Sequence, residues 1–385
     1  MENKQKAFRS GFVAILGRPN VGKSSIMNRF VGEKVAIVSN KPQTTRNKML
    51  GVVTRDDWQI VFVDTPGLHK PRTKLGEYMM KKADEAREGV DAVLCVVDAQ
   101  YIGPGDLAVM KDVSQMSCPK ILAVNKSDLV PAEKLMPELA RLNDLGFDHI
   151  VTVSAMRGDN MDDLLRLLSD QMPEGPKYFP DDMITDQPER LMCGEIIREK
   201  ALLNLREEIP HGIGVEMMAI TRLSDHLTEI HANIYCERAS HKAIIIGKQG
   251  AMLRTIGSQA REDIEKLMGP KVLLKLWVKV REDWRNRESD LRATGSEDSN
   301  HGRASDLRRD FAAPGRVRRL RPDGHAVFPD ARAHRRHCAR LPEDPVAASG
   351  RIGADGLRRV RAQRARRAVE HRSLLGARKL PGNPL

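Results

Sequence analysis

The sequence predicts an α/β protein whose first domain has a mostly parallel, doubly wound sheet and whose second domain is a smaller α+β unit. Two observations support this prediction. Residues 12–170 alternate short apolar runs with amphipathic helical patterns, which is typical of a parallel sheet covered on both faces. After a segment with four prolines, residues 191–283 follow the order α-β-β-α-α-β. We therefore expect domains at 8–172 and 191–285, joined by a linker at 173–190.

Each strand of the first domain corresponds to an uninterrupted apolar run. Amphipathic patterns lie between these runs, for example at 133–145 and 161–168. In such a sheet, ligands bind at the carboxyl ends of the strands, so the loops after these runs are the places to search for a site. The expected strands are 12–16, 60–63, 92–97, 121–124 and 150–153.

The second domain is expected to begin with a helix near 193–207. A helix at 250–267 would carry Met252, Ile256, Ala260 and Ile264 on one apolar face. The remaining expected elements are strands at 214–222, 228–237 and 272–280 and a short helix at 241–246.

Residues 286–385 differ in composition from the rest. The chain carries a net charge of +12, but residues 1–288 contribute +1 and residues 289–385 contribute +11. This last segment is rich in arginine, poor in lysine and broken by glycine and proline, which predicts a disordered tail. Two other interpretations stay open: an out-of-frame translation of GC-rich DNA, and an RNA-binding arm. Whole-chain charge is therefore poor evidence of nucleic-acid binding by the folded part.

Several classes of protein are disfavoured. No apolar run approaches the ~18 residues that span a bilayer, and the polar start indicates no signal peptide. The five cysteines are widely spaced and contain no Cys-x-x-Cys, which favours reduced thiols in a cytoplasmic protein over disulfides or a zinc site.

A phosphate-binding loop follows the first strand. Residues 17–24 read Gly-Arg-Pro-Asn-Val-Gly-Lys-Ser, the Gly-x4-Gly-Lys-Ser pattern of a P-loop NTPase between a strand and a helix. Glycines let backbone N–H groups approach phosphate oxygens. We expect Lys23 to contact the β- and γ-phosphates and Ser24 to bind Mg²⁺.

Three later loops specify the base and the reaction. Asp64 and Gly67 lie in Asp-Thr-Pro-Gly, where the acid can hold Mg²⁺ and the glycine N–H can sense the γ-phosphate. In Asn-Lys-Ser-Asp, residues 125–128, Asp128 can accept two hydrogen bonds that guanine offers and adenine does not. The loop at 154–156 fits a backbone contact to guanine O6. The sequence therefore predicts a G domain that binds GTP and GDP through Gly17, Asn20, Val21, Gly22, Lys23, Ser24, Ser25, Asp64, Gly67, Asn125, Lys126, Asp128, Ser154 and Ala155.

Residues 41–46 contain two adjacent threonines. One hydroxyl there would complete the Mg²⁺ site with Ser24 and Asp64 when the γ-phosphate is present; we expect Thr45, with Thr44 as the alternative. Segments 34–48 and 66–80 would be ordered by GTP and released after hydrolysis. An ordinary polar loop is the competing interpretation.

The motifs together resemble the Era family of GTPases over residues 8–285. The resemblance rests on the P-loop, on Gln-Thr-Thr-Arg at 43–46, on residues 64–68 and 125–128, and on Gly-Lys-Gln-Gly at 247–250. It implies a GTPase with a C-terminal type II KH domain, which binds 16S ribosomal RNA near its 3′ end during assembly of the 30S subunit. It also implies possible peripheral contact with the inner membrane. We expect a monomer that does not bind DNA.

Hydrolysis poses a specific question. Leu68 stands where Ras-like enzymes carry a water-orienting glutamine, so intrinsic turnover should be slow. We expect Lys23, Thr45, Gly67 and Asn20 to act in catalysis. In related GTPases an asparagine at the position of Asn20 binds K⁺, and a purely structural role for Asn20 is the alternative.

The Gly-Lys-Gln-Gly turn is weak evidence alone, because most such turns are only tight turns. Its place between two helices favours RNA contact through Gly247, Lys248, Gln249 and Gly250. The sequence leaves two alternative functions. One is a nucleotide-gated RNA-binding scaffold with negligible hydrolysis; the other is a tRNA-modifying GTPase, disfavoured because no second catalytic domain or terminal cysteine motif is present.

Overall fold

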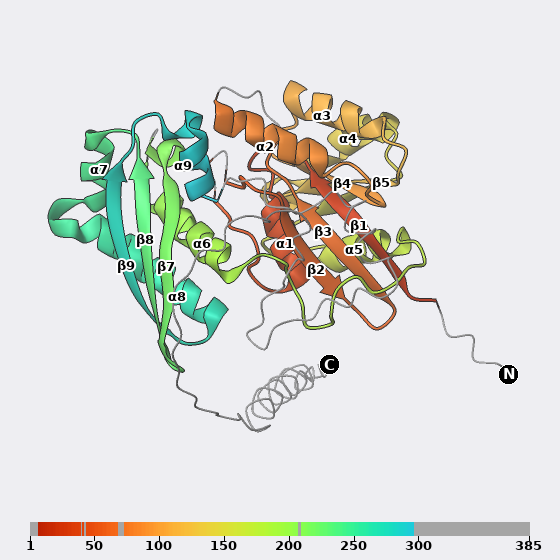
Figure 1. Cartoon of the computed structure of the whole chain (residues 1–385). Helices are drawn as coiled ribbons and strands as arrows, with labels where there is room; N and C mark the ends of the chain where they lie inside the picture. Colours follow the sequence, from red (N-terminus) through yellow and green to blue (C-terminus); the bar gives the residue numbers. More distant parts are fainter. Residues whose placement is uncertain (1–6, 40, 42–43, 68–72, 207–208, 296–385) are drawn as a thin grey trace, which may run out of the picture. The chain divides into compact units, whose positions relative to one another are not determined.

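The computed structural model describes residues 7–39, 41, 44–67, 73–206 and 209–295, and these residues belong to one compact unit. It contains a six-stranded and a three-stranded sheet, each with its own helices (Figure 1). The predicted succession of a doubly wound α/β domain and an α+β domain is confirmed.

The first domain is built around a sheet with the strand order β2-β3-β1-β4-β5-β6, in which β2 is antiparallel to β3 and the other pairs are parallel. Because β1 lies between β3 and β4, the strand order changes direction there, and the carboxyl end of β1 is where such folds bind ligands. The elements are β1 (Arg9–Leu16), α1 (Lys23–Val31), β2 (Met49–Thr54), β3 (Trp58–Asp64), α2 (Lys74–Glu85), β4 (Ala92–Asp98), α3 (Pro104–Ser114), β5 (Lys120–Asn125), α4 (Ala132–Leu142), β6 (His149–Val153) and α5 (Met161–Asp170).

Strand β2 is absent from the five apolar runs that the sequence indicated. Its sequence, Met-Leu-Gly-Val-Val-Thr, is interrupted by Gly51, which weakens a strand pattern. Packing favours the glycine, since a Cβ there would lie 2.9 Å from Cγ of Met27 on α1.

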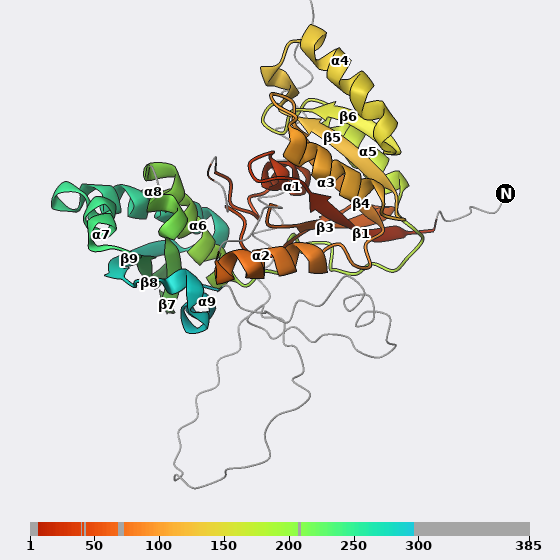
Figure 2. The same ribbon diagram turned by 90° about the horizontal axis from the view of Figure 1, so that it is seen from above.

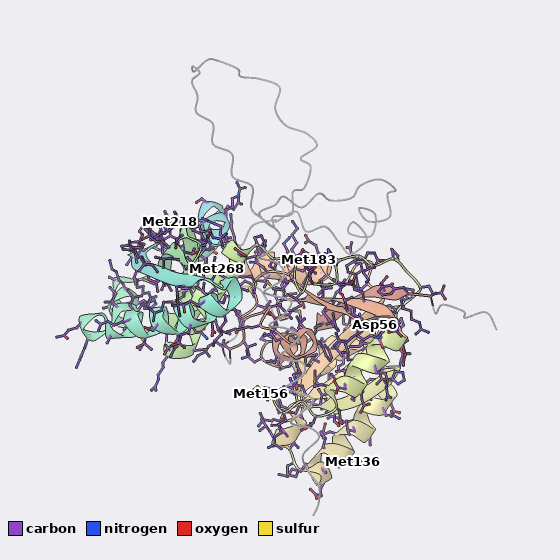
Figure 3. All side chains as sticks on the ribbon, turned by 90° about the horizontal axis from the view of Figure 1, so that it is seen from below. Asp56, Met136, Met156, Met183, Met218 and Met268 are labelled. Carbon is purple, nitrogen blue, oxygen red and sulfur yellow. The ribbon has the colours of Figure 1, made fainter. Side chains whose placement is uncertain are left out.

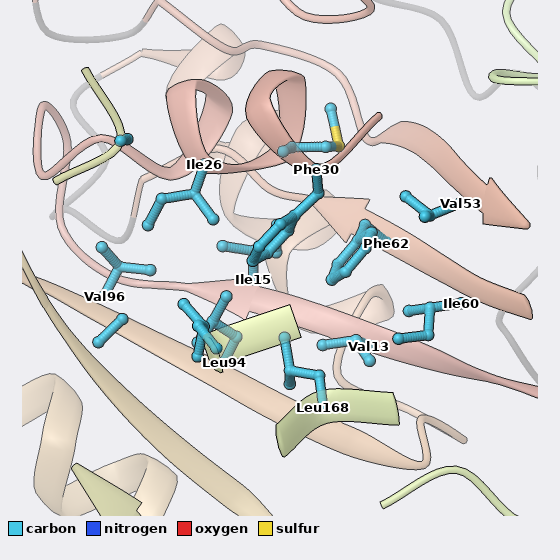
Figure 4. Packing of buried hydrophobic residues seen from close by; sticks show 14 of the residues in the cluster. Val13, Ile15, Ile26, Phe30, Val53, Ile60, Phe62, Leu94, Val96 and Leu168 are labelled. Atoms are coloured by element: carbon cyan, nitrogen blue, oxygen red, sulfur yellow. The ribbon is translucent and has the colours of Figure 1, made fainter. Parts of the chain in front are cut away.

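Alternate residues of the central strands face two hydrophobic cores. On one face, Ile15 and Phe62 pack with Ile26 and Phe30 of α1 and Leu168 of α5, as Figure 4 shows. The rings of Phe30 and Phe62 are stacked with centroids 5.0 Å apart. The second core, on the other face, joins the strands to α3 and α4. Helices on both faces explain why the strands are continuously apolar.

The segment expected to be a linker, 173–190, is anchored to the first domain. Backbone N–H groups of Tyr178 and Phe179 donate to Oε1 of the buried Gln59 at 2.8 and 2.9 Å. Phe179 is buried, and the N–H of Val52 donates to the carbonyl oxygen of Ile184 at 2.8 Å. The prolines therefore mark an extended segment that packs along the sheet.

The second domain has the strand order β7-β8-β9, with β7 antiparallel and β9 parallel to β8. Helices α6, α7 and α8 lie on one side of this sheet and α9 on the other (Figure 2). The predicted face of α8 is confirmed, because Ile256, Ala260 and Ile264 are buried in the core and Met252 packs against it. The elements are α6 (Glu189–Asn204), β7 (Gly214–Ser224), β8 (Leu227–Cys236), α7 (Ala239–Ile246), α8 (Ala251–Met268), β9 (Lys271–Val280) and α9 (Glu288–Ala293).

The ordered part of this domain extends beyond the expected end at residue 285. Trp284 is fully buried and Leu291 of α9 is buried beside it, so the expected start of a disordered tail at 286 is wrong for 286–295. The composition change misplaced this boundary because α9 is short and charged. Residues 296–385 lie outside the described part of the chain.

Two further features of the described residues concern membrane-spanning helices and cysteines. None of their helices is both long and apolar enough to cross a membrane. Cys95, Cys118, Cys193 and Cys236 are free thiols, and Cys338 lies outside the described residues.

Candidate nucleotide-binding site

The phosphate-binding loop connects β1 to α1. Helix α1 begins at Lys23, so its first N–H groups face the loop and favour an anion there. Gly22 has φ 102°, and a Cβ at this position would lie 2.1 Å from Nδ2 of Asn125. Glycine is therefore required at Gly22 by both backbone conformation and close approach.

Lys23 is nearly buried, with 6% of its surface exposed. Its ammonium group donates to the carbonyl oxygens of Gly17 and Arg18 at 3.0 Å each. Burial lowers the pKa of Lys23 to about 8, although the nearby carboxylate of Asp64 acts in the opposite direction. A buried cation at the start of a helix is suited to phosphate oxygens.

Three oxygen-bearing side chains meet beside this lysine. Oγ of Ser24 donates to Oδ2 of Asp64 at 2.6 Å and lies 3.0 Å from Oγ1 of Thr45. Thr45 also donates to Oδ2 of Asp64 at 3.4 Å. The structure thus brings together the three residues that the sequence suggested as metal ligands.

Asp64 shows that this cluster fits a hard cation. The residue is fully buried, and its Oδ1 has no hydrogen-bond partner among the described residues. Burial raises the pKa of Asp64, although Lys23 and the hydroxyls of Ser24 and Thr45 favour its charged form. An unpartnered carboxylate oxygen beside two hydroxyls is the ligand set that Mg²⁺ prefers. When bound, Mg²⁺ supplies positive charge to the phosphates.

The two candidate threonines are oriented differently. Oγ1 of Thr44 lies 2.7 Å from Oγ of Ser39 and donates to the carbonyl oxygen of Lys41 at 2.5 Å. Thr45 is the one whose hydroxyl joins Ser24 and Asp64.

The base-recognition loops converge on the same cavity. Nδ2 of Asn125 donates to the carbonyl oxygen of Val21 at 2.8 Å, and its Oδ1 accepts from the N–H of Ala155 at 3.1 Å. Asn125 thereby connects the phosphate loop to the loop after β6. Lys126 pairs with Asp98 at the end of β4, at 2.5 Å, and this ion pair holds the lysine side chain beside the cavity.

These loops surround a cavity of about 470 Å³. Gly17, Val21 and Asp64 do not line it; they support its wall through the contacts described above. Thr44, the alternative metal ligand, also lines the cavity, and six further lining residues were not in the predicted set: Pro19, Ile37, Val38, Ser39, Leu129 and Met156. Met156, labelled in Figure 3, is 81% exposed at the rim. Of these residues, Ile37 and Val38 could have been found from the sequence, because they form an apolar pair within segment 34–48, which was expected to be ordered by GTP. The predicted residues that line the cavity are Asn20, Gly22, Lys23, Ser24, Ser25, Thr45, Gly67, Asn125, Lys126, Asp128, Ser154 and Ala155.

Gly67 is the last described residue before a gap at 68–72. A Cβ on Gly67 would lie 2.5 Å from the backbone nitrogen of Pro19, so this loop approaches the phosphate loop directly. Leu68, on which the question of slow hydrolysis depends, lies outside the described residues.

The second domain presents the Gly-Lys-Gln-Gly turn between α7 and α8. Gly247 has φ 72°, Gln249 has φ 50° and Gly250 has φ 77°. Lys248 and Gln249 are exposed. Next to the turn, α8 and the edge strand β9 border a groove of about 330 Å³, lined in part by Arg254, Arg261, Leu274 and Leu276.

The fold and the cavity define a guanine-nucleotide-binding P-loop protein with a KH domain. Comparisons with known proteins agree on both parts. Residues 12–126 match a family model described as a 50S ribosome-binding GTPase, and residues 208–285 match the KH domain.

The chain belongs to the Era family of GTPases. It is 55% identical to GTPase Era of Alkaliphilus oremlandii over 291 residues, covering 75% of this chain and 99% of the relative. It is 52% identical to GTPase Era of Alkaliphilus metalliredigens, covering 76% of this chain and 100% of the relative. The expectations of a GTPase that uses GTP, GDP and Mg²⁺ are thereby confirmed.

Two solved Era structures resemble this chain. Each has a TM-score of 0.72 and 39% identity, and the match covers 75% of this chain and 99% of that chain. One is Era in complex with MgGDPNP and nucleotides 1506–1542 of 16S ribosomal RNA. The other is a variant of Aquifex aeolicus Era bound to GDP and AlF4⁻.

Proposed function

We propose that this GTPase binds the 3′ region of 16S ribosomal RNA and acts as a cytoplasmic monomer in assembly of the 30S subunit. The observation that carries this proposal is the similarity to an Era chain solved with MgGDPNP and that RNA, along 99% of its length. The scaffold alternative, in which hydrolysis is negligible, is not favoured because the family is one of GTPases.

In the nucleotide site, Ser24, Thr45 and Asp64 would hold Mg²⁺, directly or through water. The unpartnered Oδ1 of Asp64 and the 3.0 Å approach of the two hydroxyls support this role. Lys23 and the N–H of Gly67 would contact the phosphates, because both line the cavity at the start of α1. Asn20 lines the same cavity and would hold a K⁺ ion near the developing negative charge.

RNA would bind at the turn 247–250 and along the groove between α8 and β9. Two glycines at positive φ bring the backbone close to the surface without a Cβ in the way. Lys248 is exposed, and Arg254 and Arg261 line the groove, which gives positive charge for phosphates. Leu274 and Leu276 supply an apolar wall for unstacked bases.

The nucleotide state would reach the RNA-binding domain through segment 34–48. Within it, the N–H of Val38 donates to Oε1 of Glu199 on α6 at 2.8 Å. Arg198 of the same helix donates to the carbonyl oxygen of Thr44. Because Thr45 is next in sequence, a change in its Mg²⁺ ligation would shift the groups that α6 holds.

The test is RNA binding by the full chain, measured by fluorescence anisotropy with an RNA spanning nucleotides 1506–1542. Affinity should differ between a GTP analogue and GDP. Lys248→Asp combined with Gln249→Asp should weaken binding by about tenfold or more, because two negative charges would face the phosphates. The matched control is Lys111→Asp with Gln115→Asp, an exposed Lys and Gln pair at the end of α3. An equal loss of RNA affinity in both double variants, or no loss in either, would contradict an RNA site at the turn 247–250.

Glu199→Gln tests the coupling in the same assay. It weakens the ion pair with Lys34 and should reduce the ratio of the two RNA affinities about threefold, as expected for loss of one hydrogen-bonded pair. Glu262→Gln, on the exposed side of α8, should leave the ratio unchanged. An unchanged ratio in Glu199→Gln would contradict transmission through α6.

A further inference from the structure

The second domain has an exposed aromatic and basic surface apart from its groove. On β9, Val272, Leu274, Leu276 and Val278 face the helices. The alternate residues therefore point to the opposite side of the sheet, where they read Lys-Leu-Lys-Trp-Lys from Lys271 to Lys279. Trp277 is 44% exposed there, whereas Trp284 is fully buried.

Trp277 is oriented by its neighbour on β8. Its ring lies 5.3 Å from that of His231, tilted by 46°. Lys275 pairs with Oε1 of Glu229 at 2.5 Å, and Oε2 of the same carboxylate lies 3.3 Å from Nε2 of His231, which fixes this corner of the surface. The other end of the same sheet face is covered, because Tyr235 is buried under Arg281. The platform consists of His231, Leu273, Lys275, Trp277 and Lys279.

The charge of the platform favours an anionic partner. Lys275 and Lys279 stand two residues on either side of Trp277 on one face, about 7 Å away along the strand. No carboxylate pairs with Lys279 in the part of the chain that the structure describes. An exposed aromatic ring flanked by ammonium groups combines base stacking with phosphate neutralisation, which is how proteins bind single-stranded nucleic acid.

The platform is continuous with the groove. Strand β9 is the edge of the sheet, and Leu273 belongs both to the platform and to the groove lining. RNA that leaves the groove therefore has to cross only β9 before it reaches Trp277. We propose that this platform binds an unpaired RNA segment next to the one in the groove, with one base stacked on Trp277 and phosphates beside Lys275 and Lys279. The inference rests on the proposed RNA-binding function.

The test compares a short RNA with a longer one. A KH groove holds about four nucleotides, so the full chain is titrated with an RNA of about that length taken from the 1506–1542 region and with the same RNA extended to ~12. Extension should strengthen binding about tenfold in the unaltered chain, the effect of one stacked base with its phosphate contacts. Trp277→Leu and Lys279→Gln should each reduce this gain and leave the short RNA unaffected.

Control variants distinguish an effect of the platform from the general effect of losing an exposed aromatic ring or lysine. Tyr101→Leu and Lys111→Gln remove an exposed aromatic ring and an exposed lysine from the first domain and should preserve the gain. Leucine keeps an apolar side chain on β9, and thermal unfolding of each variant checks the fold. A second measurement uses 5-bromouridine in the extension, which should crosslink to Trp277.

The outcomes distinguish the two proposals. If the short RNA does not bind, the proposed function fails. If it binds and the gain survives in Trp277→Leu and Lys279→Gln, or the crosslink maps elsewhere, the platform is not an RNA site. Loss of binding to vesicles with anionic lipid in these variants, with RNA binding intact, would assign the platform to a membrane surface and overturn the proposal.

Discussion

The nucleotide cavity and the KH turn both use glycines at positive φ, but their surroundings differ. Around the cavity, Lys23, Asp64 and Asn125 are buried and hydrogen-bonded to residues of the phosphate-binding loop. In the turn, Lys248 and Gln249 are exposed. A buried polar group without its partner costs ~1–3 kcal/mol, so each cavity residue is restricted by its neighbours. An exposed side chain is restricted only by what it binds.

This difference predicts the size of mutational effects. Substitutions in the cavity should strongly alter nucleotide binding or turnover. The same conservative substitution should also have different effects at two adjacent cavity residues.

Asp128→Asn should reduce GTP affinity by about 100-fold, because two hydrogen bonds from guanine to a carboxylate are lost. Asp128 lines the cavity and lies 3.7 Å from Nε of Arg157. Xanthine has a carbonyl in place of the guanine 2-amino group, so the asparagine amide should restore binding of xanthosine triphosphate. Isothermal titration with GTP, ATP and xanthosine triphosphate measures this. A variant that keeps its GTP affinity would contradict base recognition by Asp128.

The same contrast explains what the sequence could predict. The phosphate loop and Asn125 were identifiable because buried, interlocked groups require particular residues at particular spacings, and Asp128 was identifiable because guanine recognition requires a carboxylate there. Val38 and Leu129 were not identified, since an apolar cavity wall accepts many side chains. The role of α6 was also beyond prediction: Glu199 contacts Val38, a residue 161 positions away, and no local pattern encodes that pair. Trp277 was hidden in an ordinary strand pattern, and its exposure required the sheet topology.

Thr45→Val and Thr44→Val form a matched pair of isosteric changes one residue apart. Thr45→Val should lower kcat about 30-fold and raise the Mg²⁺ concentration required, since one charge-assisted contact of ~2 kcal/mol is lost. Thr44→Val should change kcat less than about threefold, because its hydroxyl bonds Ser39 and Lys41 instead. Phosphate release over a Mg²⁺ titration measures both. Equal effects of the two substitutions would show that the orientation of Thr45 does not matter.

The smallest expected effect concerns a monovalent cation at the cavity edge. Asn20 has φ 66°, a conformation that asparagine and glycine tolerate and alanine does not. Asn20→Gly therefore removes the side-chain oxygen without straining the loop. Turnover of the unaltered chain should be about tenfold faster in KCl than in NaCl at equal ionic strength, a modest electrostatic contribution to the transition state. Asn20→Gly should show equal rates in the two salts, with the KM for GTP little changed. If the unaltered chain already turns over equally in both salts, Asn20 shapes the loop and holds no K⁺.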